Sequence, residues 1–328
     1  MSLLEVRDLH VTYPSGAGPV PAVRGVDVVL EPGDTLGLAG ESGCGKSTMA
    51  AALLRLLPKG TEVTGSVLLD GEDVLTMRPG RLRAVRWTDL AIVFQGALHS
   101  LNPVQRVGAQ IGEAIQLHST KNTDTSKRVA ELLELVGLPA RRARSYPHEL
   151  SGGQRQRVLI ALAVACEPRL LIADEPTTAL DVMVQAQVLR LLEDLKSEFG
   201  LALIFITHDL STLADVCQRI AVMYAGRIVE QGPSEKVFAD PAHPYTRALA
   251  AAFPVIGDSA FRMRPAGLPG DPPDPRDLPS GCPFHPRCAA RIDICPSTPV
   301  ELWDAGAGRA AACVHVPGSP VPTRTATV

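Results

Sequence analysis

One short segment, DTLGLAGESGCGKSTMAAALLRLLP (residues 34–58), constrains the fold of this chain more than any other. It matches G-x-x-x-x-G-K-[ST] without a mismatch, from Gly40 through Lys46 to Ser47. An apolar run typical of a buried strand precedes the glycines, and a run typical of a helix follows them. Strand, glycine-rich loop and helix in this order predict a phosphate-binding loop, in which backbone N–H groups and the positive helix end surround a polyphosphate. The segment therefore predicts an α/β nucleotide-binding fold.

The residues of this loop have different expected tasks around a nucleotide. Lys46 is expected to reach the β- and γ-phosphates, and the hydroxyl group of Ser47 is expected to ligate Mg²⁺. The other positions predicted to surround the phosphates are Ser42, Gly43, Cys44, Gly45 and Thr48. The expected ligand is ATP together with Mg²⁺.

Two further apolar runs end in residues that suit the same site. RLLIADEP (169–176) is typical of a buried parallel strand and ends in Asp174, expected to hold Mg²⁺, and Glu175, expected to polarise an attacking water. LALIFITHD (201–209) places His208 at the end of another strand. Ligands of open α/β sheets bind at the carboxyl ends of the strands. Taken alone, each position would be an ordinary strand end, and the phosphate loop upstream is what favours a catalytic interpretation.

A second predicted anion site follows in LSGGQRQR (150–157). Ser151 is a favourable N-cap, and the apolar run after it is typical of a helix. The sequence has only one phosphate loop for these two anion sites. The simplest hypothesis is that this segment completes the ATP pocket of another subunit.

In kind and order, these motifs resemble those of ABC transporter ATP-binding subunits: GESGCGKST, Gln95 in IVFQGA, LSGGQ, LLIADEP, TALD and His208. The resemblance covers about residues 3–235. It implies a P-loop NTPase fold with a RecA-like core, an antiparallel β subdomain and a helical subdomain. It also implies a nucleotide-sandwich dimer, in which two cassettes lie head to tail around two ATP molecules.

The resemblance further implies roles within one ATP site. Gln95 would sense the γ-phosphate and Mg²⁺, and His208 would be the switch histidine on the γ-phosphate. Together with Glu175, these residues form the expected catalytic set. Tyr13, in HVTYPSG, would stack on adenine; the alternative is an ordinary strand tyrosine.

Other roles implied by the resemblance act across the dimer. The partner's ATP would be contacted by Ser151, Gly153 and Gln154. Asp181, in TALD, would link the two sites.

Three segments resemble a narrower branch, the oligopeptide/dipeptide importers: QGALHSLNPVQRVGAQI, DPAHPYTRALAAAFP and GCPFHPRC. This resemblance implies a heterodimer with a second cassette, two transmembrane permeases, an extracytoplasmic solute-binding protein, and a peripheral location on the cytoplasmic face of the membrane. Nickel, glutathione and oligosaccharides are alternative substrates of the branch. A soluble ABC ATPase outside transport is less favoured, because such proteins usually carry two cassettes or a coiled-coil insertion. The net charge of −3 argues against a nucleic-acid partner.

The resemblance implies the division of the chain into a cassette and an extension, and composition marks the connector between them. Residues 1–240 are expected to form the cassette, with the helical subdomain at about 96–168. A proline-rich connector begins after about residue 255, within a small cysteine-rich extension expected over 241–320. Residues 321–328 are expected to be a disordered tail.

Four cysteines gather in this extension: Cys282, Cys288, Cys295 and Cys313. A segment shorter than about 40 residues rarely forms a core without a disulfide, metal or partner, and the expected cytosolic setting disfavours disulfides. The spacing lacks the tight pairs of structural zinc sites, whereas a four-thiolate iron–sulfur cluster accepts looser spacing. Some members of the branch carry a [4Fe–4S] cluster here, so the resemblance favours that centre. The alternatives are Zn²⁺, with His285 or His315 replacing a thiolate, and unligated thiols.

Overall fold

A computed structural model describes residues 2–96, 100–118, 124–178, 180–252 and 268–319. Within these ranges, a central sheet has the strand order β11-β12-β10-β9-β3-β8-β7-β6. Its strands are β3 (Thr35–Ala39), β6 (Leu90–Val93), β7 (Leu170–Asp174), β8 (Ala202–Ile206), β9 (Arg219–Tyr224), β10 (Arg227–Pro233), β11 (Trp303–Gly306) and β12 (Arg309–Ala311). The five strands from β9 to β6 pair in parallel, so their carboxyl ends lie along one edge. The apolar runs predicted as buried strands, β3, β7 and β8, are buried at every residue.

A second, antiparallel sheet has the order β2-β1-β4-β5. Its strands are β1 (Leu4–Tyr13), β2 (Val20–Leu30), β4 (Glu62–Leu69) and β5 (Glu72–Asp73). Helix α1 (Lys46–Leu53) contacts β1 and β2 on one side and β7 on the other, so it lies between the two sheets. Apolar side chains from both sheets and α1 form one buried cluster, which holds the beginning of α1 against the central sheet.

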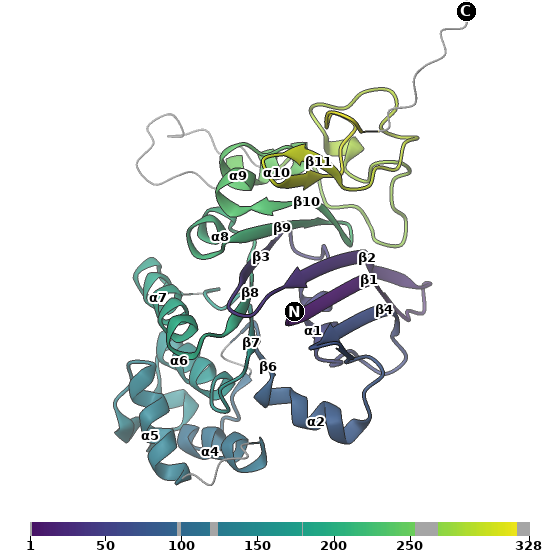
Figure 1. Ribbon diagram of the computed structural model, residues 1–328. Coiled ribbons are helices and arrows are strands. Elements are labelled where there is room, and N and C mark those ends of the chain that lie inside the picture. Colours follow the sequence, from purple (N-terminus) through teal and green to yellow (C-terminus); the bar gives the residue numbers. More distant parts are fainter. Residues whose placement is uncertain (1, 97–99, 119–123, 179, 253–267, 320–328) are drawn as a thin grey trace, which may run out of the picture.

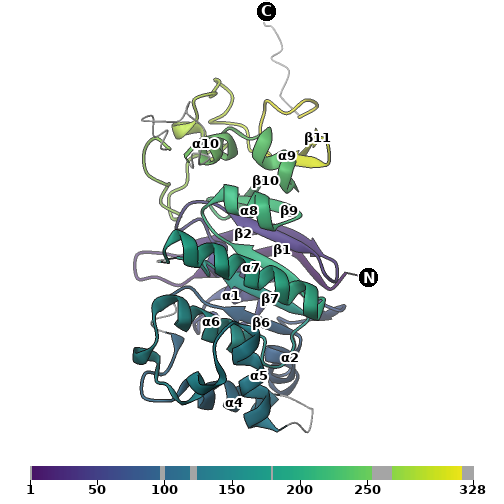
Figure 2. The same cartoon turned by 90° about the vertical axis from the view of Figure 1, so that its left-hand side faces the viewer.

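The remaining helices connect and cover these sheets. They are α2 (Pro79–Thr88), α4 (Val107–His118), α5 (Thr125–Leu135), α6 (Gly152–Ala163), α7 (Val182–Phe199), α8 (Leu210–Val216), α9 (Ser234–Ala239), α10 (Pro244–Ala252) and the 3-10 turns η1 (Ala140–Arg144), η2 (Pro147–Glu149) and η4 (His285–Arg287). Helices α4, α5 and α6 pack on one another. In both views they form a helical group at the end of the molecule opposite the C-terminal segment (Figures 1 and 2).

The C-terminal segment continues the central sheet. Strand β12 pairs antiparallel with β10, and β11 pairs with β12, so residues far along the chain add two strands to one edge. An aromatic cluster attaches the same segment to β9: the ring centroids of Tyr224 and Tyr245 are 4.6 Å apart, and Phe284 lies 5.3 Å from both. The predicted disordered tail, 321–328, lies outside the described residues. Among the helices described, none is long and apolar enough to span a bilayer.

Candidate active site

The predicted phosphate loop connects β3 to α1, and two of its glycines are required by the backbone. Gly45 has φ +109°, and a Cβ added there would lie 2.3 Å from the carbonyl oxygen of Ala22. Gly40 has φ +149°, and its added Cβ would lie 2.4 Å from the carbonyl oxygen of Met223. No other residue fits these positions without displacing the backbone of a neighbouring strand. The loop is therefore held tightly against the ends of β2 and β9.

Lys46 lies inside the curve of the loop. Its exposed fraction is 5%, and its Nζ donates hydrogen bonds to the carbonyl oxygens of Gly40, at 2.7 Å, and Glu41, at 2.9 Å. Both oxygen acceptors are neutral, so the ammonium group keeps a positive charge to offer a phosphate. This arrangement fits the task predicted for Lys46.

Asp174 and Ser47 together provide oxygen ligands for a hard cation. Burial raises the pKa of Asp174, and a hydrogen bond from the hydroxyl group of Ser47 offsets only part of this increase. Within the described part of the chain, Oδ1 of Asp174 is buried and has no hydrogen-bond partner. An unused carboxylate oxygen beside a hydroxyl group suits Mg²⁺, which is usually bound by one or two carboxylates together with substrate phosphates. When bound, Mg²⁺ would neutralise the charge that develops on the phosphates.

Glu175 is held by three side chains from separate segments. Gln95 donates from Nε2 to Oε2 of Glu175 at 2.6 Å, and Thr178 donates from Oγ1 to the same oxygen at 2.9 Å. Nδ1 of His208 lies 3.5 Å from Oε1 of Glu175. Gln95 follows β6, Glu175 follows β7 and His208 follows β8, so the parallel sheet brings the predicted catalytic set together at one edge.

Two features of this cluster were not predicted from the sequence. Glu175 has φ +45°, a conformation that costs energy in a residue with a side chain and that recurs at functional sites. Thr178 was not predicted as a site residue. The signal in the sequence was a hydroxyl residue three positions after Glu175. These two residues also close a turn, in which the Thr178 N–H donates to the Glu175 carbonyl oxygen. The carboxylate is thereby held in one orientation, as a base that positions water requires.

The LSGGQ segment begins α6, in the helical group. Ser151 caps the helix by accepting from the N–H of Gln154 at 3.3 Å, and Oε1 of Gln154 accepts from the N–H of Ser151 at 3.2 Å. An added Cβ at Gly153 would lie 2.5 Å from Cγ1 of Val184. Among the described residues, no hydrogen bond or ion pair joins this segment to the phosphate loop, residues 40–48. That separation is consistent with the prediction that the segment serves another subunit's site.

Asp181 and Tyr13 are placed by local structure. Asp181 is exposed and caps α7 by accepting from the N–H of Val184 at 3.0 Å. Tyr13 ends β1, and its hydroxyl group donates to Oγ1 of Thr48 at 3.2 Å. Tyr13 therefore lies beside the phosphate loop, while its stacking on adenine stays a prediction.

Burial raises the pKa of the Cys44 thiol, so this loop cysteine is held in its neutral form.

The four cysteines of the extension lie within electrostatic range of one another. Burial and, to a smaller extent, the other three thiols together raise the pKa of the Cys282 thiol to about 11. Each of the four sulfur atoms also accepts a backbone N–H. The donors are Phe284 to Cys282, Ala290 to Cys288, His315 to Cys313 and Ile292 to Cys295. Such bonds favour the thiolate, which is the form that binds metals, but burial outweighs them and raises the pKa of Cys282, Cys288 and Cys313.

Neither Zn²⁺ nor an iron–sulfur cluster is supported by a metal-binding group in this arrangement of the described residues. In the part of the chain that the structure describes, no group of three or more His, Cys, Asp and Glu side chains could hold a metal ion. A single Zn²⁺ would need its sulfur ligands to converge at about 2.3 Å. A ring nitrogen of His285 lies 3.0 Å from the Cys282 carbonyl oxygen, and one of His315 lies 2.8 Å from that of Ala290. These contacts use one ring nitrogen each, so they do not prevent the second nitrogen from binding a metal.

Comparisons with protein families match two parts of the chain. Residues 23–178 match the family described as "ABC transporter". Residues 229–295 match "Oligopeptide/dipeptide transporter, C-terminal region".

Individual relatives and solved structures agree with these matches. The chain is 46% identical over 316 residues to a probable peptide ABC transporter ATP-binding protein of Sinorhizobium fredii, covering 95% of this chain and 94% of the relative. It is 45% identical to the oligopeptide transport ATP-binding protein OppD of Salmonella typhimurium, covering 94% and 92%. The dimeric post-hydrolysis structure of the ATP-binding cassette MJ0796 with ADP and Pi superposes with a TM-score of 0.64 at 27% identity, over 70% of this chain and 98% of that one. For cbiO1 of Clostridium perfringens, part of an ABC transporter complex, the TM-score is 0.62 at 29% identity, over 73% and 91%.

Proposed function

The chain belongs to the ATP-binding subunits of ABC transporters, in the oligopeptide/dipeptide family, and we propose that it hydrolyses ATP to power the import of peptides. The observation that carries the catalytic part is the carboxylate of Glu175, held by Gln95, Thr178 and His208 at the same sheet edge as the phosphate loop. Glu175 accepts a proton from the attacking water, Gln95 and His208 orient that water and the γ-phosphate, and Lys46 stabilises the phosphate charge.

The proposed working unit is a dimer with a second cassette, expected to be a different chain. Closure brings Ser151, Gly153 and Gln154 of each cassette onto the ATP held by the other, with Asp181 between the two sites. The exposed N-cap of α6 supports this, because a helix N-terminus with no acidic residue in its first turn is available for a phosphate of the partner.

Two transmembrane permeases and an extracytoplasmic solute-binding protein would complete the transporter and hold this chain at the cytoplasmic face of the membrane. Peptides are favoured over nickel, glutathione and oligosaccharides, because relatives that align over nearly their whole length are named as peptide import proteins. In this proposal, residues 1–240 are the cassette, with a helical subdomain at about 96–168, and residues 241–320 are the extension.

Replacing Ser151 by Asp tests the shared site. Asp caps a helix about as well as Ser, so folding and ATP binding by the isolated chain should persist. Its negative charge would oppose the partner's γ-phosphate, and hydrolysis by the assembled dimer should fall by about a hundredfold. Steady-state phosphate release and calorimetric ATP binding measure the two effects.

Ser151→Asn is the matched control, because it retains the cap without adding a charge, and it should keep most of the activity. Equal activity of the Asp and Asn variants would contradict a phosphate contact at Ser151.

The proposal includes a [4Fe–4S] cluster held by Cys282, Cys288, Cys295 and Cys313. Mutual proximity of the four cysteines and backbone N–H donation to every sulfur support a shared ligand set. The cluster would stabilise a segment too small for a large core of its own.

Iron and acid-labile sulfide analysis of the anaerobically purified full chain, with its visible spectrum, tests this centre. Cys288→Ser should lose iron, sulfide and visible absorbance, because one of four ligands is removed. Cys166→Ser, which changes a cysteine outside the extension, should lose none of them. Stoichiometric zinc without visible absorbance in the unaltered protein would contradict the cluster.

A further inference from the structure

We propose that Arg287, in the C-terminal extension, is a positioning residue of the nucleotide site: it holds and neutralises Glu41, a residue of the phosphate loop, so that the loop accepts a polyphosphate. The inference rests on the proposed ATP site. It assigns to the extension a part in nucleotide affinity, carried by a side chain 246 positions along the chain from its partner.

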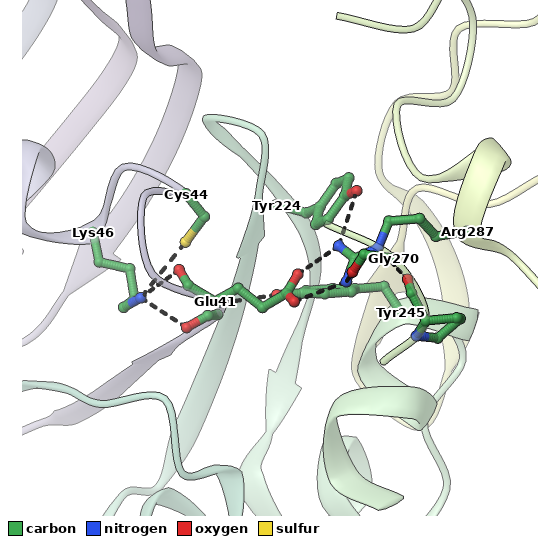
Figure 3. A network of polar contacts seen from close by, with 9 residues as sticks. Glu41, Cys44, Lys46, Tyr224, Tyr245, Gly270 and Arg287 are labelled. Atoms are coloured by element: carbon green, nitrogen blue, oxygen red, sulfur yellow. Dashed lines mark hydrogen bonds and ion pairs between the residues drawn. The ribbon is translucent and has the colours of Figure 1, made fainter. Parts of the chain in front are cut away.

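Arg287 and Glu41 form a bidentate, largely buried ion pair (Figure 3). Nη1 of Arg287 donates to Oε2 of Glu41 at 2.7 Å, and Nη2 donates to Oε1 at 2.8 Å. The side chains are 7% and 20% exposed, respectively. Arg287 is itself fixed by hydrogen bonds from Nε to the Pro269 carbonyl oxygen, at 2.7 Å, and from Nη2 to that of Gly270, at 3.1 Å. Both carboxylate oxygens are thus held by a rigid donor, a geometry that lysine could not reproduce.

Glu41 connects this pair directly to the phosphate-binding groups. Its carbonyl oxygen accepts from Nζ of Lys46 at 2.9 Å, and its N–H donates to the hydroxyl group of Tyr245 at 2.8 Å. Figure 3 shows Glu41 between Lys46 and Arg287. The side chain, N–H and carbonyl group of Glu41 are therefore all hydrogen-bonded. The partners of the side chain and of the N–H, Arg287 and Tyr245, both come after β10 in the chain. A loop fixed before binding loses less conformational entropy when a ligand arrives.

Charge gives Arg287 a second effect on the loop. A carboxylate one residue after Gly40 stands beside a site for a strongly anionic ligand, and at low exposure its repulsion of phosphates would be weakly screened. The guanidinium group of Arg287 cancels that charge at contact distance. Without Arg287, the Glu41 carboxylate would oppose the polyphosphate that the loop is built to bind.

The extension also reaches the loop beside Tyr13. A cavity of about 170 Å³ is lined by Tyr13, Glu41 and Cys44 from the cassette and, from the extension, by Pro272, Pro273 and Pro275. The extension therefore contacts the phosphate loop and its surroundings through two independent features: the ion pair of Arg287 with Glu41, and the three prolines that line the cavity.

The test measures ADP affinity by calorimetry on the full chain. Arg287→Met keeps the length and apolar packing of the side chain but removes its charge, and should weaken ADP binding by about tenfold. Adding Glu41→Gln to this variant removes the unpaired negative charge and should restore affinity to within about threefold of the unaltered chain. In steady-state hydrolysis, Arg287→Met should raise KM with kcat nearly unchanged, because the Glu175 cluster is not altered.

Arg276→Ala is the control, since Arg276 is an exposed arginine of the same extension that pairs with Asp274, and it should leave ADP affinity unchanged. If Arg287→Met does not fold, Arg287→Lys replaces it, with affinity expected between those of the unaltered and neutralised forms. Unchanged affinity after loss of Arg287, or an equal loss with and without Glu41→Gln, would overturn the inference. Lys46→Ala distinguishes a failure of this inference from a failure of the proposed ATP site. If Lys46→Ala also binds ADP normally, the assignment of the ATP site is wrong.

Discussion

Replacing Glu175 by Gln is expected to lower ATP hydrolysis by at least about a hundredfold while ATP binding persists. Gln has nearly the same shape and can still accept hydrogen bonds from Gln95 and Thr178, so the cluster at the ends of β6 and β7 should remain folded. It cannot accept the proton of the attacking water. With ATP bound and chemistry blocked, the two cassettes should stay closed.

Three measurements check this result together: phosphate release, calorimetric ATP binding, and the size of the assembled cassettes with ATP by gel filtration. Glu167→Gln makes the same chemical change in the helical group, where Glu167 pairs with Arg128, and should leave turnover nearly unaltered. Normal turnover in Glu175→Gln would exclude Glu175 as the base. Loss of ATP binding in that variant would show that the carboxylate serves binding instead.

Replacing Lys46 by Ala is expected to weaken ATP binding by about a hundredfold or more. Lys46 is the buried cation inside the loop, and its loss would remove the positive charge that faces the β- and γ-phosphates. The carbonyl groups of Gly40 and Glu41 would also lose their donor, so the loop should become less ordered.

Calorimetric titration with ATP measures this loss, and a thermal melting curve separates it from unfolding. Lys59→Ala removes an exposed lysine shortly after α1 and should bind ATP normally. Affinity close to that of the unaltered chain in Lys46→Ala would contradict the assignment of residues 40–48 as the phosphate loop.

Local patterns predicted much of the cassette. The phosphate loop could be recognised because its glycines, lysine and hydroxyl residues follow one another directly, and the positive φ angle that favours glycine at Gly45 belongs to the loop itself. The buried strands β7 and β8 were visible as apolar runs, since a strand covered on both faces excludes polar residues. Membership of the ABC transporter family and the α/β cassette fold were both confirmed.

Other features depended on residues that are distant in the chain. Strands β11 and β12 are short and lie in a segment rich in Gly and Ala, so no alternation marked them, and only pairing with β10 makes them strands. Whether the four cysteines of the extension share a metal depends on the positions of their sulfur atoms, which spacing along the chain does not determine.

What the sequence by itself determined is the set of chemical groups and the local shapes that carry them: a phosphate loop, acidic and histidine residues at strand ends, and a helix start at Ser151. The tertiary structure decided which of these groups meet. Gln95, Glu175 and His208 converge because three parallel strands end at one edge, and Arg287 reaches Glu41 because β12 and the aromatic cluster attach the extension to the sheet. Backbone-angle and capping preferences act within a few residues and can be recognised from the order of the residues. An ion pair across 246 positions exists only once packing has brought its two halves together.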